Sequence, residues 1–253
     1  MRAHIVTRAN RARYVDALDQ MHRQRHALFV EELGWNALTS VDGREIDEFD
    51  DDNAVYLLTI DHGEVIGSIR FLPSWRRSLM AEKLAGFVDG EMPIGPDIWE
   101  WTRWAPGVGV SPRKAIKSRA TLFAAAMEFA LSRGIVMFTA VVDPKYIPLM
   151  IELGWTPEPC GLIQATTEGA PAIALKWRLS PADLSQIRTA TRINRSVAIE
   201  APLAICAASE AGDLEAFAAL ASLSAPSAAA EIAQSVLHQH ALELPELKLV
   251  GRA

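Results

Sequence analysis

Two apolar runs joined by a short polar link most restrict the fold of this chain. Residues 54–60 and 65–72 are rich in valine, isoleucine, leucine and aromatic residues, and Asp61, His62 and Gly63 lie between them. Runs of this kind joined by a short turn-forming segment are typical of a β-hairpin. The sequence therefore predicts a sheet that begins with antiparallel strands.

The segments around the hairpin alternate between helical and extended patterns. A helix is predicted from Asn10 to Gly34, because apolar residues recur at steps of three and four along one face that also includes Arg25. A loop with a turn at Asp42 and Gly43 should follow. Downstream, the patterns predict a strand, a helix, a strand, a helix and a strand, at residues 98–104, 118–133, 135–142, 144–154 and 171–179.

This order of elements predicts an α/β (α+β) fold, a three-layer α-β-α sandwich with a mixed, mostly antiparallel central sheet. The order resembles that of GNAT-like acyltransferases. The resemblance implies that the central strands splay apart near their middle and that an acyl thioester enters the resulting cleft.

The character of the chain changes after about residue 180. The later residues are rich in alanine, show helical patterns interrupted by Pro226, and contain no aromatic residue after Phe217. We therefore expect one domain over residues 1–180 and a C-terminal helical extension of unassigned role over residues 181–253.

Composition excludes several classes of protein. A chain of 253 residues that is 50% hydrophobic can bury a full core, and its net charge of -6 argues against nucleic-acid binding. Two cysteines and six scattered histidines predict neither a disulfide framework nor a metal site. No uninterrupted apolar segment is long enough to span a membrane, so we expect a cytoplasmic protein.

Charged residues interrupt the apolar elements of the N-terminal half. Six of the eight residues from Glu45 to Asp52 are acidic, Arg25 lies on an apolar helix face, and Arg70 lies within a strand. Charges in such places are costly unless each finds a counter-charge or a ligand, which favours one shared polar site. The alternative is that the acidic run is a solvated surface, as we expect for its members Glu48, Asp51 and Asp52.

Two further features fit such a site. Arg25 lies one helical turn before Phe29 and not far from Trp35, so the three side chains could hold a carboxylate beside a flat or cationic group, or could be ordinary core. Glu100 and Arg103 would point to opposite faces of a flat strand, and a β-bulge between them would bring both to one side. That bulge would also free backbone N–H groups to polarise a carbonyl.

Four segments in this order resemble one known family. They are Arg25 with Phe29 and Trp35, the EIDEFD segment at 45–50, the SIR segment at 68–70 and the EWTR segment at 100–103. Together they resemble the LuxI-type autoinducer synthases, which make N-acyl-homoserine lactones. The resemblance covers residues 1–179, and residues 42–45 and 100–103 are most similar to the branch that takes acyl or aryl groups from coenzyme A instead of acyl-carrier protein.

The resemblance implies a reaction and a set of site residues. The enzyme would transfer an acyl group from a thioester, coenzyme A being favoured over acyl-carrier protein, to the α-amine of S-adenosylmethionine, and the product would then lactonise with loss of methylthioadenosine. Glu100 would be the general base, with Arg103 also in the catalytic site. The residues that would bind S-adenosylmethionine or order the site are Arg25, Phe29, Trp35, Asp47, Asp50, Arg70 and Arg103.

Two further sets of residues are expected from their position along the chain. The acyl chain would lie between the sheet and the helices, near Phe123, Met127, Thr139, Val141, Val142 and Leu149, each of which could equally be core. Positive charges at a helix start could bind the phosphates of coenzyme A or dock an acidic carrier protein, and these are Arg113, Lys114, Lys117 and Arg119.

Two other functions stay open at this point. One is a GNAT-like acyltransferase that acylates a different amine without forming a lactone. The other is a degenerate module that keeps the S-adenosylmethionine pocket but has lost donor binding, and with it catalysis, through the change at Pro106 to Pro112. In the same region, Ala105 to Gly109 interrupt the apolar strand expected for the family. The substrates are small molecules in each case, no prosthetic group is expected, and the sequence does not indicate an oligomeric state.

Overall fold

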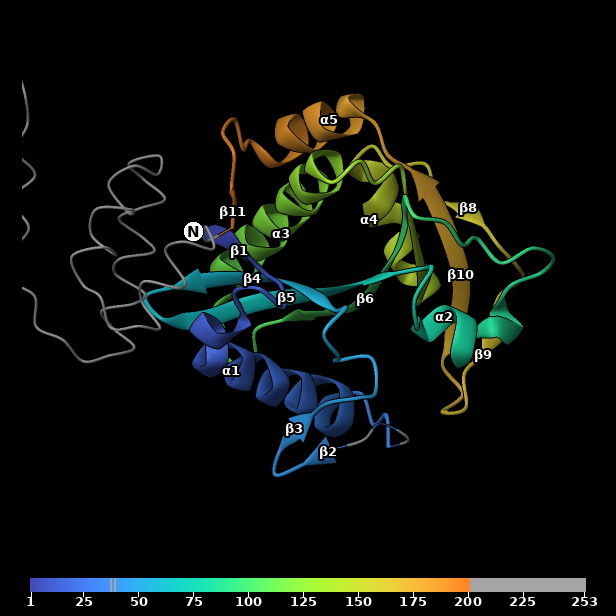
Figure 1. Ribbon diagram of the computed structural model, residues 1–253, viewed down its shortest axis with the longest axis horizontal. Coiled ribbons are helices and arrows are strands. Elements are labelled where there is room, and N and C mark those ends of the chain that lie inside the picture. The colour runs from blue at the N-terminus through green and yellow to red at the C-terminus, as the bar shows by residue number, and fades with distance from the viewer. Residues whose placement is uncertain (37, 39, 201–253) are drawn as a thin grey trace, which may run out of the picture.

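The structure is a computed structural model that describes residues 1–36, 38 and 40–200. Within these residues, one nine-stranded sheet has the order β11-β1-β4-β5-β6-β7-β10-β8, with β9 paired to β10 (Figure 1). Its strands are β1 (Arg2–Val6), β4 (Val55–Asp61), β5 (Glu64–Pro73), β6 (Ile98–Pro106), β7 (Met137–Val142), β8 (Glu158–Pro159), β9 (Gln164–Ala165), β10 (Pro171–Arg178) and β11 (Ala198–Ile199). The predicted hairpin is β4 and β5, and the sheet is mixed, with mostly antiparallel pairs.

Helices cover both faces of this sheet. They are α1 (Val15–Arg25), α2 (Leu79–Glu82), α3 (Pro112–Ser132), α4 (Ile147–Glu152) and α5 (Pro181–Thr191). Figure 1 shows α1 below the sheet and α3 above it, with α5 outside α3. One apolar core lies on the α1 face and includes Met21 and Tyr56, and another lies on the α3 face and includes Phe71 and Phe138. The three-layer α/β fold expected from the sequence is therefore confirmed.

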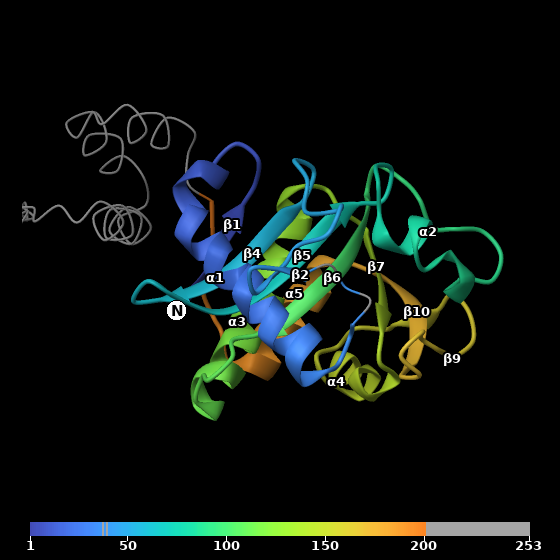
Figure 2. The same ribbon diagram turned by 90° about the horizontal axis from the view of Figure 1, so that it is seen from below.

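Strands β6 and β7 pair over only part of their length. They are parallel and in register from Ile98 with Met137 to Glu100 with Thr139, although both strands continue beyond these pairs. Figure 2 shows the two strands separating toward α4. The splayed central strands that the sequence led us to expect are therefore present, and Glu100 lies where they part.

The periodicity predicted one continuous helix in the N-terminal segment, but the segment contains three types of helix. A 3-10 turn (Arg11–Tyr14) leads into α1, and a π-helical segment (His26–Glu32) follows it. Phe29 is the buried residue of that segment and lies one turn after the buried Arg25. The segment ends at Gly34, as predicted, with the positive φ of 69° that glycine tolerates.

Two other boundaries differ from prediction. Part of the expected loop before Glu45 is a small hairpin of β2 (Ser40–Val41) and β3 (Arg44–Glu45), because Asp42 and Gly43 both adopt positive φ and form a tight turn. The long helix α3 begins at Pro112 and not near residue 118, since proline is well suited to the first turn of a helix.

Residues 181–199 pack onto the sheet domain. Ile187 of α5 is fully buried in the core on the α3 face, and β11 pairs in parallel with β1. The carboxylate of Glu128 accepts the backbone N–H groups of Val197 and Ala198, both at 2.9 Å. The expected boundary near residue 180 thus falls inside a packed unit that continues to Ile199, and the rest of the expected extension, residues 201–253, lies outside the described residues.

Candidate active site

Six charged side chains meet on the α1 face of the sheet and form a closed ring of ion pairs. Each arginine in the ring contacts two carboxylates and each carboxylate contacts two arginines. The order around the ring is Arg25, Glu45, Arg103, Asp47, Arg70 and Asp50. None of the six side chains is more than 7% exposed. The structure therefore brings together five of the predicted charged residues and adds Glu45.

The arginines hold the carboxylates through paired hydrogen bonds. Arg25 donates from Nη1 and Nη2 to the two oxygens of Asp50 at 2.8 and 2.9 Å, and from Nε to Glu45 at 2.5 Å. Arg70 donates to both oxygens of Asp47 at 2.5 and 3.0 Å. Bidentate pairs of this kind fix direction as well as distance, so the ring has a defined shape.

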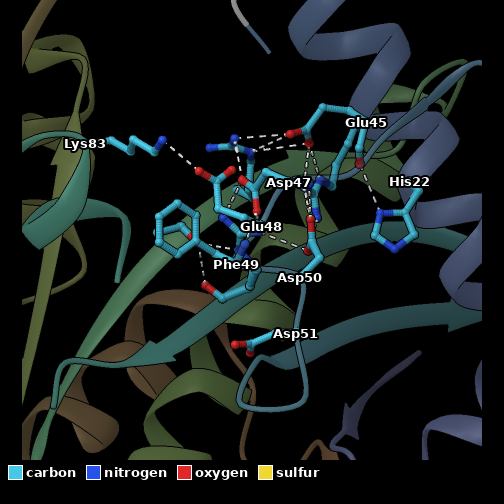
Figure 3. Close-up of polar contacts among 12 residues, drawn as sticks. His22, Glu45, Asp47, Glu48, Phe49, Asp50, Asp51 and Lys83 are labelled. Atoms are coloured by element: carbon cyan, nitrogen blue, oxygen red, sulfur yellow. Dashed lines mark hydrogen bonds and ion pairs between the residues drawn. The ribbon is translucent and has the colours of Figure 1, made fainter. Parts of the chain in front are cut away.

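The acidic side of the ring comes from the end of β3, which carries Glu45, and from the segment between β3 and β4, which carries Asp47 and Asp50 (Figure 3). Phe49 is 1% exposed and anchors this segment in the core on the α1 face. Its backbone N–H donates to Asp47 at 2.9 Å, and the N–H of Asp47 donates to Asp50 at the same distance. A buried aromatic residue between two carboxylates thus turns both of them toward the arginines.

Neighbouring charges keep two members of the ring, Asp50 and Arg70, ionised. Burial alone would raise the pKa of Asp50, but Arg25 and Arg70 hold that pKa well below its ordinary value. Burial alone would lower the pKa of Arg70, but Asp50 and Asp47 raise it. The opposite charges compensate one another, which is the condition for burying them at all.

A β-bulge in β6 turns Arg103 toward the ring. The pairing of β5 with β6 slips there, because the single residue Ile69 faces both Arg103 and Trp104. Arg103 has φ of 50°, a left-handed conformation that a residue with a side chain seldom adopts. The sequence predicted a bulge between Glu100 and Arg103. The observed bulge instead includes Arg103 itself and serves the expected purpose of bringing its side chain to the α1 face.

Two aromatic rings lie beside the ring of charges. Phe29 and Trp35 are stacked, with centroids 5.1 Å apart and planes inclined by 12°. The guanidinium carbon of Arg103 lies 5.7 Å from the centroid of Phe29. Phe29 is buried and Trp35 is partly exposed, so together they form an aromatic wall next to the arginine.

Glu100 is a separate buried carboxylate on β6. It is 1% exposed, and one oxygen, Oε1, accepts the backbone N–H of Met80 at 2.9 Å. The other oxygen, Oε2, has no hydrogen-bond partner among the residues that the structure describes. Burial raises the pKa of Glu100 to about 7, although the backbone of Met80 and the nearby arginines act in the opposite direction. A carboxyl group in this state can exchange a proton near neutral pH.

The remaining acidic residues of the run lie at the surface. Glu48 pairs with Lys83 at 2.7 Å and Asp52 with Arg8 at 3.3 Å, while Asp51 accepts from the N–H of Asn53. Figure 3 shows Glu48 directed toward Lys83 and Asp51 apart from the network. The acidic run thus divides into buried and solvated members as the sequence analysis supposed.

The residues expected to contact the acyl chain are divided between the two faces of the sheet. Thr139 lies beside Glu100 in the parallel register, and strand alternation puts Val141 on the same face. The others belong to the core on the α3 face or pack against it, and these are Phe123, Met127, Val142 and Leu149. The two groups adjoin the region where β6 and β7 separate.

The four basic residues proposed to meet phosphate or a carrier protein all lie in the first turns of α3. Lys114 pairs with Asp61 at 3.0 Å. Arg113 and Lys117 are exposed and one helical turn apart, and Arg119 is partly exposed. The structure thus places them together on one solvated helix end, away from the buried ring.

Sequence reasoning missed three contributors to the site. Glu45 bridges Arg25 and Arg103 in the ring, whereas the sequence indicates it only as a member of the acidic run. Thr102 accepts from Arg70 Nε at 3.0 Å, and the backbone of Met80 holds Glu100. Only Glu45 left a signal in the sequence, as the first acid of the run. The hydroxyl and backbone contacts depend on strand register.

The described part of the chain lacks two further features. No group of three or more histidine, cysteine, aspartate or glutamate side chains there is arranged to hold a metal ion. None of the helices described is both long enough and apolar enough to cross a membrane.

Comparison with known proteins agrees with this geometry. The autoinducer synthase family model matches residues 9–187. Isovaleryl-homoserine lactone synthase of Bradyrhizobium diazoefficiens is 37% identical over 161 residues, which are 63% of this chain and 72% of that protein. The structure of a CoA-dependent acyl-homoserine lactone synthase, BjaI, with MTA has a TM-score of 0.73 and 32% identity, and covers 79% of this chain and 93% of that one.

A second structure of the same enzyme, BjaI with SAM and isopentyl-CoA, has a TM-score of 0.72 and 32% identity over the same shares of the two chains. The family model covers well over half of the chain, including the ring of charges, the bulge and Glu100. The chain therefore belongs to the autoinducer synthase family, the acyl-homoserine-lactone synthases.

Proposed function

We propose that this protein transfers an acyl group from a coenzyme A thioester to the α-amine of S-adenosylmethionine and then closes an N-acyl-homoserine lactone with release of methylthioadenosine. The observation that carries this proposal is Glu100. It combines a pKa of about 7, one oxygen held by the backbone and one oxygen without a partner among the described residues, at the point where β6 and β7 separate.

Glu100 acts as the general base of the acyl transfer. An α-ammonium group titrates at about 8, so a carboxylate of pKa near 7 is well matched to take its proton, directly or through one water. The amine nitrogen then attacks the thioester carbon, the carbon–sulfur bond breaks, and the thiol leaves with a proton. Because Met80 fixes one oxygen of Glu100, the other is the one directed to the amine.

Arg103, Phe29 and Trp35 hold S-adenosylmethionine. The Arg103 side chain is the most exposed of the three ring arginines, at 6% against 0% for Arg25 and 1% for Arg70, so it is the one that a substrate carboxylate can reach. The aromatic wall offers π-faces to the sulfonium and to the adenine ring. The other charged residues of the ring order the site without having to contact the substrate, and these are Arg25, Glu45, Asp47, Asp50 and Arg70.

The β6 backbone past Glu100 polarises the thioester carbonyl. Its register with β7 ends at Glu100, so the N–H groups of the following residues on that side lack ladder partners from β7. Each donor of this kind contributes about 3 kcal/mol to an oxyanion hole in other enzymes. The lactone then forms when the substrate carboxylate attacks the carbon attached to sulfur, which expels methylthioadenosine and depends mainly on how the chain is folded.

Coenzyme A is the donor that the comparisons favour, since the two solved structures with TM-scores of 0.73 and 0.72 are described as a CoA-dependent enzyme. The exposed basic residues of α3, which are Arg113, Lys114, Lys117 and Arg119, would meet its phosphates, and the same charges could dock an acidic carrier protein. We expect the enzyme to act in the cytoplasm, as its composition predicts.

The direct test is product formation. Purified protein should be incubated with S-adenosylmethionine and a panel of acyl donors, each supplied both as the coenzyme A thioester and on acyl-carrier protein. We expect methylthioadenosine and N-acyl-homoserine lactone in equal amounts, with the coenzyme A donors turning over faster. Release of an acylated amine without lactone would favour the GNAT-like alternative, and no methylthioadenosine with any donor would contradict the proposal.

The pH dependence of the reaction should report Glu100. The base must be ionised, so kcat/KM should fall about tenfold per pH unit below pH 7, reaching about a hundredfold loss at pH 5. Free S-adenosylmethionine adds an opposite limb near pH 8, because at higher pH its amine has already lost the proton that Glu100 removes. Initial rates between pH 5 and 9, at low S-adenosylmethionine concentration, would resolve the two limbs.

The pH profile needs a control showing that the protein stays folded at each pH. The pKa of Asp50 lies below its ordinary value in the folded protein, so its contribution to stability is present at and above pH 5 and is lost only at lower pH. Circular dichroism should therefore show folded protein across the assay range.

A limb near pH 7 that persists in the pH profile of a Glu100→Gln variant would assign that titration to another group.

A further inference from the structure

Two tryptophans on the α3 side of the sheet carry buried polar atoms that the proposed mechanism does not use. Trp155 follows α4 and is 3% exposed, and Trp177 lies in β10 and is 2% exposed. Neither indole Nε1–H has a hydrogen-bond acceptor among residues 1–36, 38 and 40–200. Buried tryptophans usually pair this group, because an unpaired buried donor destabilises the fold. Two such donors on neighbouring rings therefore indicate an acceptor that is not among the described residues.

The two rings belong to one aromatic cluster. Their centroids are 5.6 Å apart, and Trp101 lies 5.6 Å from Trp155 and 6.2 Å from Trp177. Phe123 packs 5.4 Å from Trp155, and Phe138 packs 5.9 Å from Trp177. The cluster is apolar apart from the indole N–H groups, so it suits a ligand that is mostly hydrocarbon and has few polar atoms.

The position of the cluster connects it to the acyl group. Trp101 is the first residue of β6 beyond the last pair with β7, and it directly follows Glu100. The two residues point to opposite faces of the sheet, so a chain that starts at a thioester beside Glu100 and passes between the parting strands reaches the α3 face at Trp101. Trp155 and Trp177 are the next rings along that course.

We propose that the acyl group taken by this enzyme carries an acceptor oxygen at the end remote from the thioester, and that the indole N–H groups of Trp155 and Trp177 donate to it. The inference rests on the proposed function and names its substrate class. A ketone, ether or hydroxyl oxygen on an otherwise apolar, compact or aryl acyl group has this chemistry. A plain hydrocarbon chain leaves both donors unpaired.

Discrimination of this kind is expected to be large. A pocket that is built to hydrogen-bond a substrate rejects the analogue without that group far more strongly than an apolar pocket rejects a small change of shape. A single neutral hydrogen bond corresponds to roughly a tenfold change in kcat/KM. Two donors should give a preference of at least about tenfold.

The test uses acyl donors that differ only at the remote end. Each methyl-ketone acyl-CoA is paired with an isopropyl-ended counterpart, in which a methyl group replaces the ketone oxygen, over several chain lengths. At the best length, we expect kcat/KM at least about tenfold higher for the ketone. Trp155→Phe and Trp177→Phe should each lower that ratio several-fold by reducing the ketone rate, while the rate with the isopropyl donor stays nearly unchanged.

Trp99→Phe is the matched control. Trp99 is on β6 and packs on Trp75 and Phe129, away from the two unpaired indoles, so its replacement should leave the ratio unchanged. Equal kcat/KM for both donors of every pair, or a ratio that neither variant alters, would overturn the inference. The second result would mean that the indoles are satisfied by buried water or serve only as packing.

A binding measurement separates this inference from the proposed function. Calorimetry gives the affinity of the same thioester pairs without turnover. If no donor yields methylthioadenosine, the proposed function fails, yet the affinities still decide the inference. Tighter binding of the ketone that is lost in Trp155→Phe would support it, and equal affinities within every pair would contradict it.

Discussion

Replacing Glu100 with glutamine should lower turnover by about a hundred- to ten-thousand-fold, the range typical of losing a general base. Glutamine keeps the shape of the side chain and can still accept the N–H of Met80, so the pocket should hold its form. It cannot take a proton from the amine. S-adenosylmethionine affinity should therefore change by no more than about threefold, because the substrate is held by Arg103 and the aromatic wall.

The measurements are single-turnover rates at saturating substrates and S-adenosylmethionine affinity by calorimetry. Glu48→Gln is the matched control, since Glu48 belongs to the same acidic run but pairs with Lys83 at the surface. That variant should retain full turnover. If Glu100→Gln lost affinity and turnover by equal factors, Glu100 would be a binding group and not the base.

The same variant tests the state of the carboxyl group through stability. The pKa of Glu100 is about 7 in the fold against an ordinary value of 4.5, so the stability tied to its protonated form is complete below pH 4.5 and is lost as the pH rises through 7. Glutamine does not titrate. Urea unfolding should therefore show Glu100→Gln gaining roughly 3 kcal/mol relative to wild type between pH 4.5 and pH 8. A difference that does not vary with pH would mean that burial does not perturb this group.

Local sequence patterns were enough to predict most of the fold. Alternation and turn residues located the β4–β5 hairpin, the strand face of Arg70 and the end of the first helical segment at Gly34. These features depend on residues close together in the chain. The π-helical segment did not show in the pattern, because its apolar residues also fit an α-helix, and the structure alone shows that Phe29 is the buried one.

The candidate site was predicted in outline for a different reason. Arg25, Arg70 and Arg103 interrupt apolar elements, and an interior charge requires a partner, so their convergence with the acidic run followed from energetics. The same argument does not predict which carboxylate pairs with which arginine within the ring. Which acid bridges which arginine depends on the bulge at Arg103, which is set by the pairing of β5 with β6, two strands far apart in sequence.

Glu45→Gln should produce the largest loss of stability among single substitutions in the acidic run. Glu45 is fully buried and bridges Arg25 and Arg103, so the change leaves two buried guanidinium groups with one fewer counter-charge. Removing one partner of a buried pair typically costs about 3–5 kcal/mol. In a protein of this size, that corresponds to a fall in Tm of roughly 10 °C. Chemical and thermal unfolding followed by circular dichroism would measure both.

Asp52→Asn is the control from the same run. Asp52 lies at the surface and pairs with Arg8 at 3.3 Å with both side chains largely exposed, so its replacement should change stability by no more than about 0.5 kcal/mol. Similar losses for the two variants would mean that the ring is not a structural unit.

Because Arg103 takes its position from Glu45 and Asp47, the Glu45→Gln variant should also bind S-adenosylmethionine more weakly, whereas Glu100→Gln should not. This opposite pattern would separate the residues that shape the site from the one that performs the chemistry.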